Sequence, residues 1–404
     1  MGSVAILNTA AVMTCGAAAG GNLGILEHGA VAIVDGQVAW VGEERALPDW
    51  ASRLPKLDAG NGLVTPGLVD PHTHPLFGGE RSGEFAMRAA GRTYQEIAQA
   101  GGGIMATVRA TRAASDEALL AGAGRRLRCA LEHGTTTLEA KTGYALTVGG
   151  EIRLLRLLRE LGQMQPVRLV PTLLGAHVVP VERMQDSRQR SAYVEECATS
   201  MIAGARELAA AVDVYCDEGA FSLVEARTIL EAARAAGMQV RAHAGQFRDL
   251  GAAGLVAELA GLSADHLEQL SEEQAARMAS AGTVATLLPG ACVQLRLSPP
   301  PVALLRSAGC AMAIGTDMNP GSSMTESLPL QLWIATTHFG LTVDEAWLGV
   351  TRYAARAAGR FDAGRLDPGA AGDAVVWDAT DPATVPYHYG ANLVRTVVVA
   401  GVAV

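Results

Sequence analysis

Eight short apolar segments alternate with amphipathic helical segments across this 404-residue chain, and this alternation limits the possible folds more than any other feature. The apolar segments, which we expect to be strands, are LVTPGLVD, TTTLEAK, VRLVPTLL, VDVYCD, MQVRAHA, LSADHL, GTVATLLP and CAMAIGTD. Strands that alternate with helices predict βαβ units and a parallel sheet. Eight such units over roughly 300 residues predict an α/β fold with a (β/α)8 TIM-like barrel.

A doubly wound open sheet is the main alternative for such an alternation. In its dinucleotide-binding form a G-x-G-x-x-G turn joins a strand to a helix, and no expected strand here is followed by one. The glycine-rich segment AGGGIMAT at residues 100–107 follows a helical pattern, TYQEIAQ. We therefore interpret it as a loop over a site and not as a phosphate loop.

The helical segments carry start and stop signals. SLVEARTILEAARAAG begins with Ser222 and has Glu225 three residues later, which predicts a capping box, and it ends at Gly237. GEIRLLRLLRELG, residues 150–162, has the apolar spacing of a helix with one buried face.

The two ends of the chain have a different pattern, with short strands and turns. SVAILNTA and AVAIVDGQVAWVG lie near the start, where Asp35-Gly36 predicts a hairpin, and DAVVWDAT and NLVRTVVVAGVAV lie near the end. Neither end has enough strands for a stable sheet, so we expect them to form one small β-sandwich domain together. The expected boundaries are 1–62 and 363–404 for the small domain and 63–362 for the barrel.

Composition excludes several classes of function. A formal net charge of −9 provides no basic surface for nucleic acid or anionic membranes, and 49% hydrophobic residues indicate a well-filled core. No Lys or Arg precedes Arg45, so we expect no signal peptide, and glycines make the first uncharged stretch a poor membrane span. The six cysteines show no C-x-x-C spacing, which is typical of reduced thiols in a cytoplasmic protein.

Polar side chains recur at the C-terminal ends of the expected strands, where a (β/α)8 barrel places its functional residues. In chain order they are His72, His74, Lys141, Tyr144, His177, Asp217, Glu218, His243, Gln246, His266, Asp317 and Asn319. A single histidine on a strand is usually structural, but five of the nine histidines fall on this rim. We therefore expect a site there, and we interpret His28, His338 and His388 as structural.

Histidine and carboxylate side chains together suit zinc or ferrous iron, whereas magnesium and calcium prefer oxygen ligands. His72 and His74 are one residue apart, so both side chains point to one face of an extended segment. Three histidines and one aspartate leave a position for water, and water on such a metal titrates near neutrality. Asp317 could bind the metal and accept a proton, and His266 could transfer that proton or polarise the electrophile.

These strand-end residues resemble the amidohydrolase superfamily, a group of metal-dependent hydrolase barrels. The longer motifs are similar to its imidazolonepropionase family: PGLVDPHTHPLFGGER, EFAMRAAGRTYQEIAQAGGGI, KTGYAL, LLGAHVVP, SADHLE, LLPG and TDMNPGS. They span Pro66 to Ser322, and the split small domain also matches. The resemblance therefore covers nearly the whole chain.

The resemblance implies a hydrolase of histidine degradation that opens the ring of 4-imidazolone-5-propanoate to N-formimidoyl-L-glutamate. It implies one divalent metal ion, Zn2+ or Fe2+/Fe3+, with the ligands His72, His74, His243 and Asp317. The implied catalytic residues are His266 and Asp317. The implied substrate contacts are Arg81, Tyr94, Tyr144, His177, Gln246, Asn319, Gly321 and Ser322.

The expected partner is a small carboxylate-bearing molecule, which Arg81 would bind through its guanidinium group. The alternative for Arg81 is a surface ion pair with Glu80 or Glu84. No nucleic acid or membrane partner is expected. Barrels of this kind often form homodimers, but no stripe of residues identifies an interface.

Four positions depart from the pattern of this family. Thr142 and Ala145 stand where serine and glycine are usual, and Gly245 stands where an acidic residue is usual. Gln246 occupies a position that is glutamate in some members. Glutamine cannot act as a base, so it can only orient substrate or water through hydrogen bonds. Proton transfer would then depend on other side chains, for which the candidates are His266 and Asp317.

Other functions fit the same ligands. A deaminase of a cyclic amidine such as guanine would share the metal site, but a neutral ring has no carboxylate for Arg81 to bind. A barrel that has lost its chemistry is a further alternative, although all four expected ligands are present. Lys141 could be carboxylated and bridge two metals, but Thr142-Gly143-Tyr144 is typical of a substrate loop. We therefore expect one metal.

Overall fold

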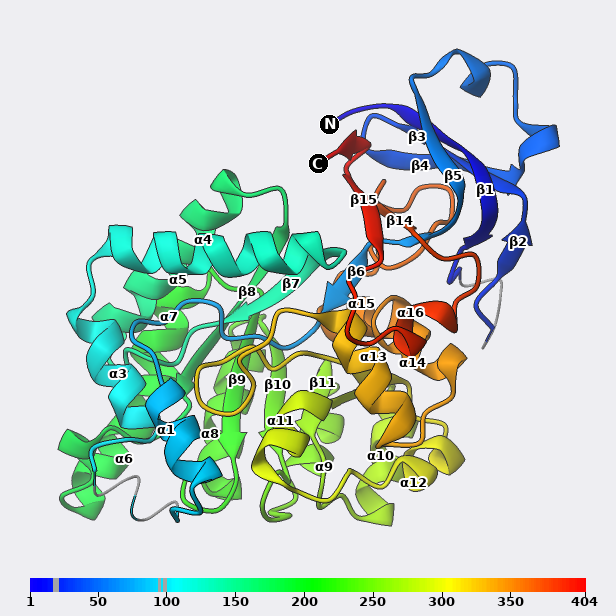
Figure 1. Cartoon of the computed structure of the whole chain (residues 1–404). Coiled ribbons are helices and arrows are strands. Elements are labelled where there is room, and N and C mark those ends of the chain that lie inside the picture. Colours follow the sequence, from blue (N-terminus) through cyan, green and yellow to red (C-terminus); the bar gives the residue numbers. More distant parts are fainter. Residues whose placement is uncertain (17–21, 94–95, 97–99) are drawn as a thin grey trace.

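The computed structural model of this protein describes residues 1–16, 22–93, 96 and 100–404. Two sheets dominate the described chain (Figure 1). One is a barrel surrounded by helices, and the other is a smaller sheet beside it that contains both chain ends. This arrangement agrees with the fold that the sequence predicts.

The barrel contains eight parallel strands that follow one another in chain order. They are β6 (Leu68–Asp70), β7 (Thr135–Lys141), β8 (Arg168–Ala176), β9 (Ala211–Cys216), β10 (Gln239–Ala244), β11 (Ser263–His266), β12 (Val284–Leu287) and β13 (Met312–Ile314). An isolated parallel bridge between Thr73 and Met318 joins the segments that follow β6 and β13. The barrel is therefore nearly closed just beyond its first and last strands.

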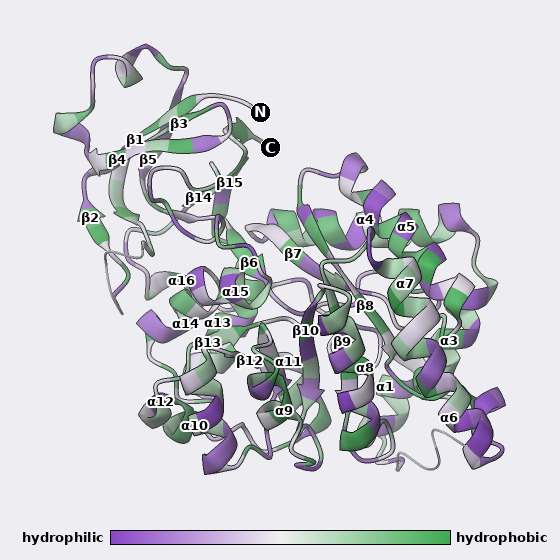
Figure 2. Ribbon diagram, turned by 180° about the vertical axis from the view of Figure 1, so that it is seen from behind, coloured by the Kyte–Doolittle hydropathy of each residue, from purple (hydrophilic) through white to green (hydrophobic). Residues whose placement is uncertain are grey.

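Helices cover the outside of the barrel, and they carry hydrophilic as well as hydrophobic residues (Figure 2). Those between barrel strands are α1 (Ser82–Ala89), α3 (Ile104–Ala113), α4 (Asp116–Glu132), α5 (Val148–Met164), α6 (Ser187–Glu196), α7 (Ile202–Ala205), α8 (Leu223–Ala235), α9 (Ala252–Glu258), α10 (Glu272–Ala281), α11 (Pro289–Leu295) and α12 (Val302–Ala308). After β13 come α13 (Leu328–Thr337), α14 (Val343–Gly349), α15 (Arg352–Ala357) and α16 (Thr384–Tyr387). Short 3-10 helices are η2 (Glu44–Ala46), η3 (Ala51–Arg53) and η4 (Val181–Arg183), and η5 (Cys197–Met201) is a short π-helix.

The start of α8 illustrates how local sequence sets these helices. The Glu225 backbone N–H donates to the Ser222 hydroxyl at 3.4 Å, and the Ser222 N–H donates to the Glu225 carboxylate at 2.8 Å. The predicted capping box is therefore present. After the helix, Gly237 has φ +79°, a conformation that favours glycine.

The small sheet is mixed and contains strands from both chain ends, as predicted. Its strands are β1 (Val4–Met13), β2 (Ile25–Glu27), β3 (Gly29–Val34), β4 (Gln37–Glu43), β5 (Lys56–Pro66), β14 (Ala374–Trp377), β15 (Val394–Val399) and β16 (Val402–Ala403). The Asp35-Gly36 hairpin joins β3 to β4, with φ of +49° and +79°. The chain ends lie side by side, since the Gly2 N–H donates to the Ala400 carbonyl at 2.8 Å.

The segment LVTPGLVD is not one barrel strand, as the sequence predicts, but is divided between the two sheets. Residues up to Pro66 belong to β5 of the small sheet, and β6 begins at Leu68, with one residue between the two strands. The intervening Gly67 N–H donates to the Asp373 carbonyl at 3.0 Å. A Cβ on Gly67 would overlap the hydroxyl of Thr136, which explains the glycine. The expected domain boundary at residues 62 and 63 falls inside β5.

The main apolar core lies between the barrel and its helices, and a separate cluster fills the small sheet. Trp377 of β14 packs edge to face on Trp347 of α14, with ring centroids 5.7 Å apart. This contact joins the small sheet to the barrel. Among the described residues, no helix combines the length and apolar character needed to cross a membrane.

Candidate metal centre at the barrel mouth

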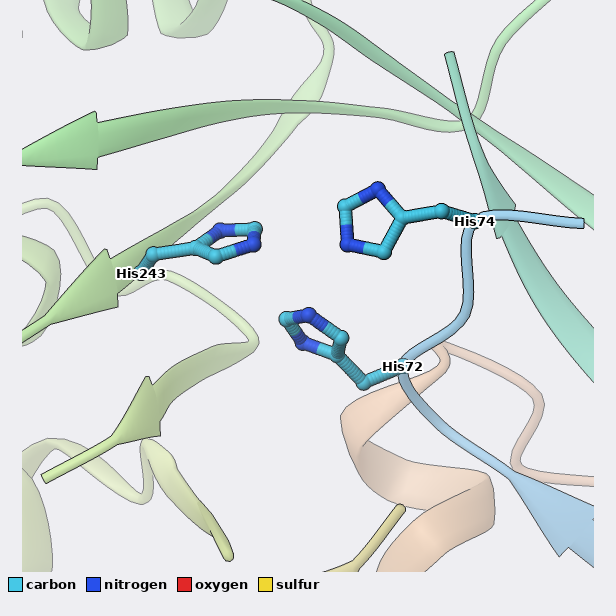
Figure 3. Close-up of side chains that lie close together, drawn as sticks. All are labelled: His72, His74 and His243. Atoms are coloured by element: carbon cyan, nitrogen blue, oxygen red, sulfur yellow. The ribbon is translucent and has the colours of Figure 1, made fainter. Parts of the chain in front are cut away.

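His72, His74 and His243 come together at the C-terminal end of the barrel strands. His72 and His74 lie in the segment that follows β6, and His243 lies on β10. One ring nitrogen from each lies within 4.8 Å of the others, and all three side chains are buried. Figure 3 shows the three rings pointing toward one another from these two parts of the chain. The structure thus brings together three of the four predicted ligands in one cluster.

Asp317, the fourth predicted ligand, lies beside these rings just after β13. Its Oδ1 is 3.4 Å from Nε2 of His72 and 3.5 Å from Nε2 of His74. Burial would raise the pKa of this carboxyl group, but the contacts with the two imidazoles hold it well below its ordinary value. Asp317 is therefore an ionised oxygen donor at the same point.

Two of the three clustered rings contact a carboxylate through Nδ1, on the side away from the other histidines. Nδ1 of His72 lies 2.6 Å from Oδ2 of Asp265. Nδ1 of His243 lies 3.1 Å from Oδ1 of Asp213. In a neutral ring such a contact places the proton on Nδ1 and leaves Nε2 with a lone pair. Burial would lower the pKa of His72, but its contacts with Asp265 and Asp317 raise that pKa to about 9, so His72 must lose a proton when a metal binds. Burial lowers the pKa of His243 to about 3, so that ring is neutral.

The donor set fits a metal ion. Within the described part of the chain, Nε2 of His72 and Nε2 of His243 are buried and have no hydrogen-bond partner. Unprotonated imidazole nitrogens together with one carboxylate oxygen are the ligands that zinc and iron prefer. The cluster could therefore hold a metal.

His266 lies at the edge of this cluster, on β11 next to β10. Its ring centroid is 5.8 Å from that of His72 and 5.4 Å from that of His243. Its Nδ1 is buried, has no hydrogen-bond partner in the described chain and lies 3.8 Å from Oε1 of Glu268. This position is close enough to act on a molecule at the metal centre.

His177 and Tyr144 line the same space. The ring of His177 stacks on His74, with centroids 5.3 Å apart, and its Nδ1 donates to the Gly143 carbonyl at 3.1 Å. The Tyr144 ring lies 5.4 Å from His177 and 5.9 Å from His74. Both side chains are buried and lie close to His74, one of the predicted ligands.

The loop that carries Tyr144 is held by Glu151, a residue that the sequence did not indicate. This fully buried carboxylate of α5 accepts the backbone N–H groups of Gly143, Ala145 and Leu146 at 2.8, 2.8 and 2.7 Å. Thr142, one of the departures from the family pattern, accepts the Leu174 N–H at 3.1 Å and ties the loop to β8.

Arg81 forms the ion pair that the sequence offers as its alternative role. Its Nε and Nη2 donate to the two carboxylate oxygens of Glu84 at 2.9 and 2.8 Å. The Arg81 side chain is only 13% exposed, however, and a Cβ on Gly321 would overlap its Nη1. Arg81 is therefore not a surface arginine but lies between α1 and the loop after β13.

Asn319, Gly321 and Ser322 lie in that loop. The Asn319 side-chain oxygen accepts the N–H groups of Gly321 and Ser322 at 2.8 and 2.9 Å. Its amide nitrogen donates to the Asp317 carbonyl at 2.6 Å. Arg88, which the sequence did not indicate, donates to the Gly321 carbonyl at 3.0 Å. The Asn319 side chain thus shapes the loop directly beside the candidate metal centre.

Gln246 is buried close to the cluster, and its side-chain oxygen accepts the Tyr215 hydroxyl at 2.9 Å. The Tyr215 ring lies 5.4 Å from His243, so it is a further candidate for contact with a ligand. Gly245 has φ +66°, a conformation that favours glycine. Tyr94 lies outside the described residues.

A network of buried ion pairs lies inside the barrel, and the sequence indicates only one of its members, Lys141. The five buried members of this network are Glu139, Lys141, Asp213, Arg241 and Asp265. Nζ of Lys141 lies 2.6 Å from Asp213 and 3.1 Å from Glu139. Burial alone would lower the pKa of Lys141, but these two carboxylates raise it above its ordinary value. Lys141 is therefore an ion-paired ammonium, which does not suit it to a carboxylated bridge between metals.

Comparison with known proteins identifies close relatives. Residues 100–404 match the profile of the Amidohydrolase family. The imidazolonepropionase of Paracoccus denitrificans is 45% identical over 387 residues, which are 94% of this chain and 95% of that protein. The imidazolonepropionase of a Methylobacterium species is 48% identical over 374 residues, 92% of either chain.

Solved structures share the fold at much lower identity. A mutant of the atrazine chlorohydrolase TrzN from Arthrobacter aurescens, complexed with zinc and atraton, has a TM-score of 0.75 at 18% identity and covers 99% of this chain and 94% of its own. An adenosine deaminase from Xanthomonas campestris with bound zinc has a TM-score of 0.71 at 18% identity, with 99% and 92% covered. These likenesses support the architecture described above.

Proposed function

Because this chain belongs to the imidazolonepropionase family of the amidohydrolases, we infer that it is a hydrolase of histidine degradation that acts on a C–N bond. It opens the ring of 4-imidazolone-5-propanoate to N-formimidoyl-L-glutamate. Water adds to the ring carbonyl carbon, and the bond between that carbon and the ring nitrogen breaks. The observation that carries this function is the 45% identity over 94% of the chain.

We propose Zn2+ or Fe2+/Fe3+ as the resident metal, with one ion per chain. His72, His74, His243 and Asp317 would hold it, since their donor atoms converge. A divalent ion in such a site supplies Lewis acidity and lowers the pKa of water toward neutrality.

Protons are proposed to move through His266 and Asp317. Asp317 is ionised and can accept a proton from the attacking water. His266 lies beside His243 and can pass a proton to the leaving ring nitrogen. Gln246 takes no part in proton transfer and orients the substrate through its amide.

The substrate carboxylate is proposed to bind Arg81, which would set the ring against the metal centre. Glu84 holds two of the guanidinium nitrogens, so the group is oriented before the substrate arrives. Tyr144 and His177 would then contact the ring, because both rings lie beside His74.

The cytoplasm is the proposed location. All six cysteines are free, and five of them are buried. Thiols of this kind are usual where glutathione and thioredoxin keep proteins reduced.

Ultraviolet absorbance of 4-imidazolone-5-propanoate tests the function directly. The zinc-loaded protein should remove the absorbance at a rate proportional to its concentration, and H243A should not. Guanine, the substrate of the alternative deaminase, should remain unchanged. If the metal-loaded protein left the imidazolone intact, the proposed function would be wrong.

A further inference from the structure

The buried ion network touches two of the proposed ligands on the side away from the metal. Asp265 contacts Nδ1 of His72 at 2.6 Å, and both side chains are 0% exposed. Asp213 contacts Nδ1 of His243 at 3.1 Å, with exposures of 0% and 4%. His74 has no such contact, and its Nδ1 is without a hydrogen-bond partner in the described chain.

Lys141 lies between the two aspartates. Its Nζ is 2.6 Å from Oδ2 of Asp213, whose other oxygen faces His243. It is also 3.7 Å from Oδ2 of Asp265, the oxygen that faces His72. A buried carboxylate without a cation would be costly, so the ammonium allows both aspartates to remain ionised acceptors.

The direction of these contacts matters because a neutral imidazole has two tautomers. Only the tautomer with its proton on Nδ1 leaves the Nε2 lone pair of His72 and His243 available to a metal ion. In water both tautomers are accessible, and a carboxylate on Nδ1 selects this one while it fixes the plane of the ring.

We propose that Asp265 and Asp213 are positioning residues that preset His72 and His243 for the metal, and that Lys141 holds the two aspartates in place. This inference rests on the metal site proposed above. Loss of such an outer carboxylate typically weakens metal binding by about 10–100-fold. The aspartates act through the histidines and need not touch the substrate.

Zinc affinity of the full-length protein tests the proposal. The metal-free protein is titrated with Zn2+ against a fluorescent chelator, and folding is checked by circular dichroism. D265N and D213N should each raise the apparent Kd about 10–100-fold. D265A should weaken zinc binding further than D265N, because the asparagine side chain can still accept a hydrogen bond from Nδ1–H and alanine cannot.

D217N is the matched control. Asp217 is a buried carboxylate after β9 that accepts the backbone N–H groups of Glu218, Phe247 and Arg248 at 2.6, 2.9 and 2.9 Å. Its loss should destabilise the fold without changing the zinc affinity. An equal loss of affinity in D217N, or wild-type affinity in D265N and D213N, would overturn the inference and leave the proposed function intact. A wild-type protein that binds neither zinc nor iron would overturn both.

A measurement on the wild-type protein covers the case in which the variants fail to fold. In the zinc-loaded protein labelled with 15N-histidine, two ligand rings should show exchange-protected Nδ1–H protons with strong hydrogen-bond shifts. Zinc bound through Nδ1 of either His72 or His243 would contradict the proposal.

Discussion

At the scale of single residues, two of the proposed ligands differ from His266 in the contacts on the far side of their rings. His72 and His243 each have a carboxylate on Nδ1, at 2.6 and 3.1 Å. His266 has only Glu268, with 3.8 Å between Nδ1 and Oε1. His266 is also not one of the three histidines that cluster, since it lies at their edge, so we assign it to proton transfer and not to metal binding.

H266N should therefore keep its metal and lose rate. We expect kcat to fall by about 10²–10⁴-fold, the usual contribution of a general acid or base. Elemental analysis and kcat are measured on the same preparation. A metal-free variant would instead assign His266 to the ligands.

R81M should lower kcat/KM by about 10–150-fold, because a hydrogen bond to a charged group contributes roughly 1.5–3 kcal/mol. The control is a substrate analogue with the ring but without the carboxylate, on which the substitution should have little effect. Equal losses on both substrates would show that Arg81 supports the structure, through its ion pair with Glu84 and its contact with the loop after β13, and does not bind the substrate.

Sequence reasoning predicted the residues whose role depends on position at a strand end, such as His72 and His74. It missed Asp213 and Asp265 because the sequence around a single acidic residue in an apolar strand does not show which residue its carboxylate contacts. Their partners are also far away in the sequence: Lys141 is 72 residues from Asp213, and His72 is 193 residues from Asp265. Such pairs become visible only when the barrel brings the strands together.

At the scale of elements, alternation predicted the barrel strands because every βα unit repeats the same pattern. TTTLEAK forms β7 as predicted, since its ends coincide with the turns on either side. LVTPGLVD has the pattern of one strand because both of its halves are apolar. Its change of sheet at Gly67 depends on Asp373, which lies far along the chain. Loop anchors such as Glu151 were also missed, because a helical glutamate is usually exposed.

E151Q should disturb the loop that carries Tyr144. An amide cannot accept all three backbone N–H groups that the Glu151 carboxylate accepts, and an unsatisfied buried donor costs about 1–3 kcal/mol. We expect a lower Tm and a higher KM, with zinc content unchanged. E160Q, at an exposed position of the same helix, is the control and should match the wild type. A wild-type KM in E151Q would contradict the assigned role.

At the scale of the whole molecule, the candidate metal centre brings together segments that are distant in the chain. His72 follows β6, Asp317 follows β13, and His243 belongs to β10. A bound ion would therefore connect β6 and β13, the two strands between which the barrel closes, to β10 on the other side of the barrel. An ion that binds only the folded state stabilises it by mass action.

Metal removal should therefore lower the Tm. At free zinc 100-fold above its Kd, the ion should add about 2.7 kcal/mol to the free energy of unfolding. Calorimetry across a series of zinc concentrations should show a rising Tm in the wild type and none of this dependence in H72A. A wild-type Tm that did not change with zinc would argue against a buried site.

The pairing of β5 with β14 has a consequence for biosynthesis. β14 pairs with β5 from Ala374↔Pro66 to Trp377↔Leu63, so the ribosome makes the two partners far apart in time. At 5–20 residues per second, roughly 300 intervening residues take about 15–60 s to translate. During that interval the edge of β5 that will pair with β14 has no partner, only a few residues before His72. Unpaired strand edges can form hydrogen bonds with other chains and cause aggregation. Chaperone capture of the growing polypeptide should therefore concentrate on β5 until β14 emerges.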